Sequence, residues 1–133
     1  MRVSMTSKKG YNADMDANAW IKGFPGAVTV CNAQGRIIAM NDKAVEVFAA
    51  DGGAALVGRN VLECHPQPAR TKLKKMLESG RANIYTIQKK GKKKLIYQAP
   101  WCHGGRYAGF VELSLELPAV LPHFDRDSSR KRP

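Results

Sequence analysis

Cysteine is scarce in this chain, and the spacing of the few that are present excludes several kinds of site. The 133 residues contain three cysteines, Cys31, Cys64 and Cys102. They form no Cys-x-x-Cys pair, so we expect neither a disulfide framework nor a zinc site, and covalent attachment of a c-type haem is excluded. We therefore predict buried thiols and assign no metal ligands.

Long apolar segments are also missing. No run approaches the roughly 20 apolar residues that span a bilayer, and the polar N-terminus lacks the apolar core of a signal peptide. We therefore expect a cytoplasmic protein with no membrane partner. The motifs of serine hydrolases, P-loop proteins and zinc proteases are absent as well, so we assign no catalytic residue and expect no enzymatic activity.

Acidic residues are few compared with basic ones. The chain has 22 Lys and Arg against 11 Asp and Glu, a formal net charge of +11. Five lysines, at positions 89, 90 and 92–94, crowd one expected hairpin tip. No helix-turn-helix, zinc-finger or aromatic RNA-binding motif accompanies them, so we interpret the charge as a solvated surface. A nucleic-acid-associated regulatory protein stays open as an alternative, with salt-dependent DNA binding as its test.

The stretch Ala27 to Phe48 is the most informative part of the sequence. Apolar residues alternate with small or polar ones, and Gly35 closes a tight turn that Asn32 begins. After a second β-rich run, Asn41 occupies the N-cap position of a segment with helical spacing. The stretch therefore predicts a strand, a turn, a second strand and a capped helix.

Helices are predicted on both sides of this unit. Residues 14–22 can form a short helix that ends at the Gly-Phe-Pro-Gly turn of residues 23–26. A longer helix lies between Pro68, which suits a first turn, and Gly80, which suits a C-terminal stop. Its apolar residues fall on one side: Ala69, Leu73, Met76 and Leu77.

Three strands follow, over residues 83–88, 93–102 and 106–117, with turns around Gly91 and Gly104. Two strands, a group of helices and a three-stranded meander imply an α+β fold, with one antiparallel sheet and helices on one of its faces. We predict a flexible tail over 1–12, a flanking helix over 13–23, a domain over 24–118 and a flexible basic tail over 119–133.

The order of these motifs resembles the PAS domain, a small sensor module of signalling proteins. There an apolar strand, an amide residue, a Gly turn and a capping Asn succeed one another, as Asn32, Gly35 and Asn41 do here. Residues 56–62 resemble the segment that follows a short helix in this family, and residues 105–112 resemble its last hairpin. The resemblance covers Ala27 to Leu117 and implies a five-stranded sheet in the order 2-1-5-4-3.

The resemblance also implies a sensory cavity between sheet and helices, which binds a small ligand or a protein partner and relays the change through the flanking segments. Apolar periodicity suggests which side chains face it, although a core packed without any ligand remains the alternative. Tyr85 and Tyr97 would need hydrogen-bond partners there. The predicted pocket residues are Val30, Met40, Phe48, His65, Leu73, Met76, Leu77, Tyr85, Ile87, Tyr97, Val111 and Leu113.

The sequence suggests one possible cofactor, haem, and one partner, a second copy of the chain. His65 precedes the long helix and is a candidate axial ligand for haem in a gas or redox sensor, against the alternative of a histidine that caps the helix. Covalent flavin is not expected, because Val61 stands where light-sensing relatives carry their reactive cysteine. In relatives the N-terminal helix and the outer sheet face commonly form a homodimer, which predicts an interface that includes Trp20, Ile21 and Phe110.

Overall fold

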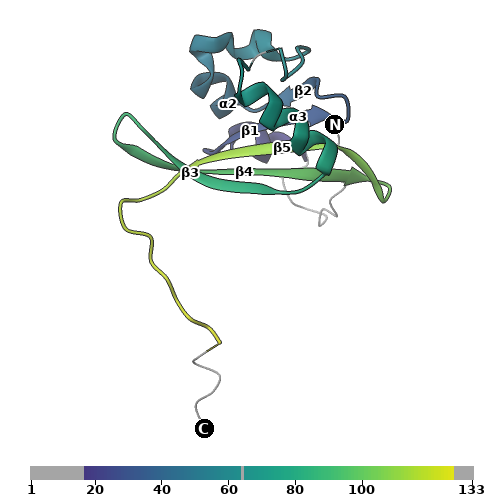
Figure 1. The fold of residues 1–133 in the computed structure, drawn as a ribbon. Coiled ribbons are helices and arrows are strands. Elements are labelled where there is room, and N and C mark those ends of the chain that lie inside the picture. The colour runs from purple at the N-terminus through teal and green to yellow at the C-terminus, as the bar shows by residue number, and fades with distance from the viewer. Residues whose placement is uncertain (1–16, 64, 128–133) are drawn as a thin grey trace, which may run out of the picture.

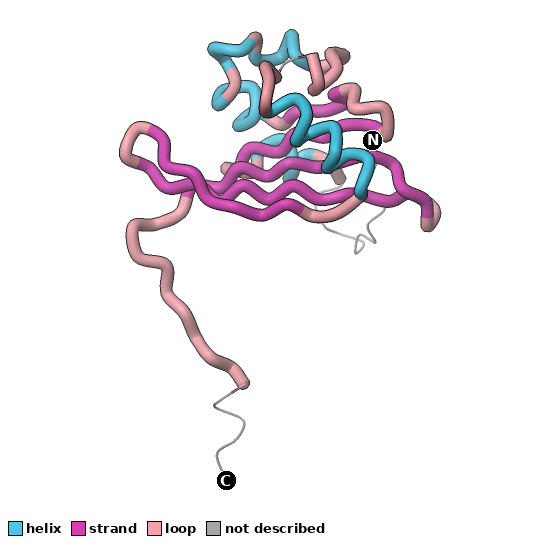
Figure 2. The backbone as a smooth tube through the Cα atoms, viewed as in Figure 1, coloured by secondary structure: helices cyan, strands magenta, loops and turns pink. Residues whose placement is uncertain are grey.

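The computed structural model describes residues 17–63 and 65–127. Within them the chain forms one five-stranded antiparallel sheet in the order β2-β1-β5-β4-β3. Figure 1 shows α2 and α3 on one face of the sheet, and Figure 2 shows how the long strands β4 and β5 extend beyond the helices. The α+β class and the strand order predicted from the sequence are confirmed.

The elements follow the predicted order with small shifts of their ends. The first half contains α1 (Ala19–Gly23), β1 (Ala27–Asn32), β2 (Ile37–Met40) and α2 (Asp42–Val47). Two 3-10 turns, η1 (Ala49–Asp51) and η2 (Gly53–Leu56), lead to α3 (Ala69–Ser79). The second half contains β3 (Asn83–Lys89), β4 (Lys92–His103) and β5 (Arg106–Glu116).

The N-terminal helix is shorter than predicted at the positions that can be compared. Residues 17 and 18 form a turn and α1 begins at Ala19, whereas the sequence predicted a helix from residue 14. Residues 1–16, and with them the whole expected tail over 1–12 and the start of the expected flanking helix, lie outside the described residues. Residues 119–127, the described part of the expected C-terminal tail, contain no helix or strand.

Side-chain caps and glycines end the elements where the sequence indicated. Asn32 Oδ1 accepts hydrogen bonds from the backbone N–H groups of Gln34 and Arg36, at 3.0 and 2.9 Å. These bonds hold the β1–β2 turn, which Gly35 closes at φ 83°. Gly80 ends α3 in the left-handed conformation at φ 64°, as expected of a C-terminal glycine.

Alternation along the strands gives the sheet two unlike faces. The helix face carries Thr29, Gln98 and Glu112, which line the same space as Leu73 of α3. Because neighbouring residues of a strand point to opposite sides, Val30, Tyr97 and Leu113 lie on the outer face. The prediction that Val30, Tyr97 and Leu113 face the helices is therefore wrong. The pattern of β5 is amphipathic, but its polar side is the one that faces α3.

The best-packed region lies between β1, β2 and the segment around η2. Cys31, Ile37, Leu56 and Val61 form a buried cluster, against which Met40, Phe48, Leu73 and Leu77 pack. The other end of the sheet is open, since every residue of β3 is exposed and no residue of α3 is fully buried. The helix face thus passes from a closed core at β1 to an accessible surface at β3.

Candidate functional site

A pocket of about 200 Å³ lies between the helix face of the sheet and the helices. Its lining comes from β1, β2, β4 and β5 below and from η2, α3 and the segments around them above. The side of the pocket next to β1 coincides with the buried cluster, so the pocket is an extension of the core. Lining residues are Thr29, Cys31, Ile37, Met40, Phe48, Asp51, Leu56, Val61, His65, Leu73, Met76, Leu77, Gln98, Phe110, Val111 and Glu112.

About half of the residues predicted for the pocket lie there. Six are contributed by β2, the end of α2, α3 and the segment before it: Met40, Phe48, His65, Leu73, Met76 and Leu77. Val111 borders the pocket between Phe110 and Glu112, and by alternation its side chain lies on the outer face.

Five predicted residues do not line the pocket. Val30, Tyr97 and Leu113 are on the outer face of the sheet, because alternate residues of a strand point to opposite sides. Their assignment to the pocket was wrong. Tyr85 and Ile87 do share the helix face, because they pair with Ile96 and Lys94 of β4, yet they remain 42% and 37% exposed. Strand β3 thus extends past the pocket.

A row of polar side chains runs across the helix face of the sheet and forms part of the pocket floor. Asn83, Gln98, Glu112 and Thr29 occupy directly paired positions on β3, β4, β5 and β1. Asn83 Nδ2 donates to Gln98 Oε1 at 3.1 Å, and Gln98 Nε2 donates to Glu112 Oε2 at 2.7 Å. The row therefore holds the Glu112 carboxylate in a defined orientation beneath the helices.

Tyr85 lies next to this row, and the row affects the pKa of its phenol. Partial burial raises the pKa of the Tyr85 phenol above its ordinary value of 10.0. The negative charge of Glu112 raises the pKa further, while the hydrogen bond with Gln98 lowers it. The phenol of Tyr85 therefore stays protonated to higher pH than a free tyrosine.

His65 reaches the pocket from the segment before α3. Its Nδ1 lies 2.6 Å from the carbonyl oxygen of Val61, and because a carbonyl can only accept, Nδ1 carries the proton of this bond. In the neutral ring, Nε2 is then the nitrogen that can accept a hydrogen bond or bind a metal. The ring is hydrogen-bonded to Val61, which precedes it in the chain, and not to an N–H group of α3. The alternative in which His65 caps the helix is therefore wrong.

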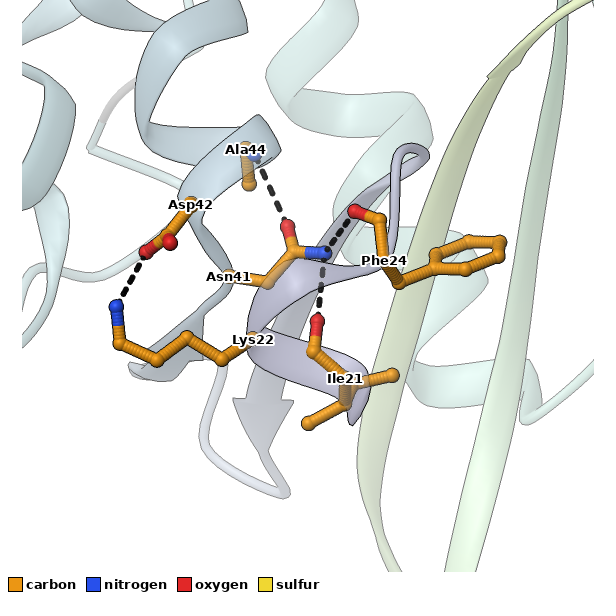
Figure 3. A network of polar contacts seen from close by, with 6 residues as sticks. All are labelled: Ile21, Lys22, Phe24, Asn41, Asp42 and Ala44. Atoms are coloured by element: carbon orange, nitrogen blue, oxygen red, sulfur yellow. Dashed lines mark hydrogen bonds and ion pairs between the residues drawn. The ribbon is translucent and has the colours of Figure 1, made fainter. Parts of the chain in front are cut away.

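Asn41, the residue after the pocket residue Met40, joins the core to the N-terminal helix (Figure 3). Asn41 is 6% exposed, and its Oδ1 accepts from the backbone N–H groups of Val28 at 2.9 Å and Ala44 at 3.0 Å. Its Nδ2 donates to the carbonyls of Ile21 at 3.0 Å and Gly26 at 2.8 Å. One side chain thus caps α2, continues the pairing between β1 and β2 at Val28, and binds a carbonyl of α1.

An ion pair on the surface lies beside this network. Lys22 of α1 and Asp42 of α2 are 2.8 Å apart, and their side chains are 72% and 67% exposed. Figure 3 shows it next to the Asn41 bonds. Exposed pairs of this kind contribute at most about 1 kcal/mol, so the buried amide is the stronger connection.

Comparisons with known proteins agree with this geometry. The family model described as PAS fold matches residues 21–117. The chain belongs to the PAS family. Among solved structures, a C-terminal domain from Streptococcus mutans is similar to this PAS domain at 26% identity and a TM-score of 0.67. That match covers 84% of this chain and 90% of that one.

Two further structures share the fold at lower identity. The PAS domain of Bordetella pertussis BvgS matches at 17% identity and a TM-score of 0.56, covering 84% of this chain and 86% of that one. The Aer2 receptor of Vibrio cholerae, a dual PAS-heme oxygen sensor, matches at 11% identity and a TM-score of 0.55, covering 70% and 95%. The comparison with curated proteins found no significant match. Both likenesses are to the fold.

Several pocket residues of this PAS domain were missed by the sequence reasoning. Thr29, Gln98 and Glu112 were overlooked because polar residues of a strand were assigned to solvent. Ile37, Leu56 and Val61 belong to short segments whose apolar spacing is too brief to show a direction. The signal that could have found the polar row is the hairpin register, which the two-residue turn at Lys90 and Gly91 determines.

The residues predicted for a dimer interface separate in this PAS domain. Trp20 is 52% exposed on α1, while Ile21 is half-buried beside the Asn41 network. Phe110 is 5% exposed and lines the pocket, so its assignment to the outer face was wrong. The physical reason is again the side of the sheet to which alternate residues of β5 point.

Two of the three cysteines lie among the described residues. Cys31 is buried as predicted, whereas Cys102 is exposed and Cys64 lies outside the described residues. The five lysines at positions 89, 90 and 92–94 lie at the β3–β4 hairpin tip. In the described ranges no helix has the length and apolar character to cross a membrane, and the compartment stays a prediction.

Proposed function

We propose that this PAS domain is a sensor whose pocket binds a small molecule. The observation that carries the proposal is the pocket itself: about 200 Å³ of space with an apolar wall and an oriented polar floor. A packed core would fill such a space with side chains, whereas ligand sites combine apolar walls with a few placed polar groups. We propose no catalytic role.

The signal leaves the pocket through Asn41. Met40 lines the pocket, and the next residue bonds to α1 through Nδ2 and to α2 through Oδ1. A ligand that displaces β2 or α2 changes the geometry of those bonds and so the stability of α1. Ligand-driven switching requires that the ligand bind two conformations with different affinity. In one of these conformations α1 is bound by Asn41 Nδ2, and in the other it is not.

Native mass spectrometry of the freshly purified chain tests ligand binding. We expect a non-covalent mass above that of the polypeptide, lost on denaturation. Leu73→Trp fills the pocket from α3 and is expected to abolish the extra mass, while Lys72→Trp, on the exposed side of the same helix, keeps it. Identical spectra for the wild type and Leu73→Trp would contradict the proposal.

Haem bound through His65 is the second candidate, because His65 lines the pocket with Nε2 available. The space argues against it. Pockets for drug-sized ligands measure roughly 300–1,000 Å³, and the pocket of about 200 Å³ would have to enlarge for a macrocycle. An absorption spectrum after haem addition decides the matter: a Soret band that His65→Ala removes would establish this candidate over the first.

A homodimer is proposed on the outer face of the sheet. Leu95, Tyr97, Leu113 and Leu115 lie there together, and Tyr97 is 39% exposed. This apolar face supports an interface better than Trp20 and Ile21 alone. Light scattering tests it: Tyr97→Lys is expected to shift the protein to monomer, and a wild type that is monomeric at high concentration contradicts the proposal.

A further inference from the structure

The charges that line the pocket have the opposite sign to the charge of the whole chain. The sequence holds 22 Lys and Arg against 11 Asp and Glu. The pocket nevertheless carries the carboxylates of Asp51 and Glu112, and no lysine or arginine from residues 17–63 and 65–127 lines it. A pocket with carboxylates and no cation of its own favours a positively charged ligand and disfavours an anion.

Glu112 is placed to receive such a ligand. Gln98 donates to its Oε2 at 2.7 Å, and Asn83 holds Gln98 in turn at 3.1 Å. Within the described part of the chain, no salt bridge neutralises Glu112 and its Oε1 accepts no hydrogen bond. An oriented carboxylate with one open oxygen and no counter-ion can bind an N–H donor strongly.

The remaining lining suits the rest of such a molecule. Leu73, Met76 and the rings of Phe48 and Phe110 form apolar walls, and aromatic faces attract cations as well as apolar groups. His65 Nδ1 is engaged with Val61, so in the neutral ring Nε2 adds a second acceptor for an N–H donor. The space of about 200 Å³ limits the molecule to the size of one ring with a short substituent.

We infer that the ligand of this pocket is a small organic amine, whose ammonium group binds Glu112 and whose apolar body lies between the sheet and α3. The inference rests on the proposed function, because it names the ligand class for the same pocket.

Three probes of nearly equal size and different charge test the inference: benzylamine, benzyl alcohol and benzoate. Each is titrated into ¹⁵N-labelled protein at neutral pH and followed by NMR, with the side-chain amide of Gln98 as the reporter on the pocket floor. Glu112→Gln removes the charge and keeps the shape. Glu116→Gln is the matched control, since Glu116 lies on the same strand and face outside the pocket.

We expect benzylamine to bind the wild type about tenfold or more tighter than benzyl alcohol, since both can donate to Glu112 but only the ammonium group carries the charge that complements the carboxylate. Benzoate should not bind. Glu112→Gln should lose the preference for the amine and still bind benzyl alcohol, which shows that the pocket persists. Glu116→Gln should keep the preference.

Two results would overturn the inference and leave the proposed function standing: benzyl alcohol or benzoate binding as tightly as the amine, or a preference for the amine that survives in Glu112→Gln. Absence of binding by all three probes also overturns the inference. In that case the proposed function is decided separately, by the masses of the wild type and Leu73→Trp.

Discussion

Asn41→Asp separates the two roles of the residue that joins the pocket to α1. Asn41 Oδ1 accepts from the N–H groups of Val28 and Ala44, and an aspartate keeps both bonds and remains a good N-cap. Its second oxygen, however, replaces the Nδ2 donor and comes to face the carbonyl oxygens of Ile21 and Gly26. The substitution thus releases α1 and leaves the cap of α2 intact.

The magnitude follows from the bonds that are lost. Each of the lost hydrogen bonds contributes about 1 kcal/mol, and carbonyl oxygens left opposite a buried carboxylate add a further penalty. We expect the free energy of unfolding to fall by about 3 kcal/mol, which for a domain of this size lowers Tm by on the order of 15 °C. Asn41→Ala should cost more, because it also removes the cap.

Hydrogen exchange resolves where the loss occurs. The N–H groups of Lys22 and Phe24 bond to Asn18 and Ile21 within and around α1. In Asn41→Asp these amides should exchange much faster, while that of Ala44 stays protected. Asn32→Asp is the matched control, because Asn32 uses only its Oδ1 in the described structure, and it should cost less than about 0.5 kcal/mol. Unchanged exchange at α1, or equal loss at Ala44, refutes the assignment of two separate roles.

Three other expectations concern packing and pH. Gly109→Ala should lower the free energy of unfolding by about 3 kcal/mol or more, measured by chemical denaturation, because the new Cβ would lie 1.9 Å from the Cys31 carbonyl oxygen. The control Gly104→Ala has nothing within 4 Å of its Cβ and should cost only the strain of the left-handed conformation, about 1 kcal/mol. Equal losses in the two variants would contradict the close approach at Gly109. Leu56→Ala opens the buried cluster and should cost about 2–5 kcal/mol, a smaller loss showing that the cluster is not the core. The pKa of Tyr85 is raised in the folded state, so the stability that this group contributes is complete below pH 10.0 and is lost as pH rises through the folded pKa. Tyr85→Phe should therefore lose less stability above pH 10.0 than the wild type. Parallel plots of unfolding free energy against pH for the two proteins would refute this expectation.

The fold could be predicted because local signals agree along the chain. Asn32, Gly35 and Asn41 define a turn and a cap that each have a physical cause, and the structure has both where expected. Gly80 ends α3 for the same kind of reason. Helix 14–22 was predicted too long, because propensity alone does not place a helix end.

The pocket was harder to predict, because alternation in a strand defines two faces without saying which one the helices cover. Leu113 was assigned to the helix face because it is apolar, and the same reasoning assigned Val30 and Tyr97 to the pocket and Phe110 to the outer face. In the structure each of them lies on the opposite face. The polar row through Glu112 requires the pairing of β3, β4 and β5, which is set by the turns and by a bulge near Trp101. The role of Asn41 at α1 depends on contacts across the fold, so the sequence showed only its role as a cap.

Hydrogen exchange at α1 with the pocket occupied and with it emptied tests most directly the claim that pocket and α1 are coupled. The protein is compared as purified and after unfolding, removal of small molecules and refolding. We expect the amides of Lys22 and Phe24 to change their exchange rates between the two samples, and Asn41→Asp to abolish the difference. Equal rates at α1 in samples that differ in bound mass would contradict the account.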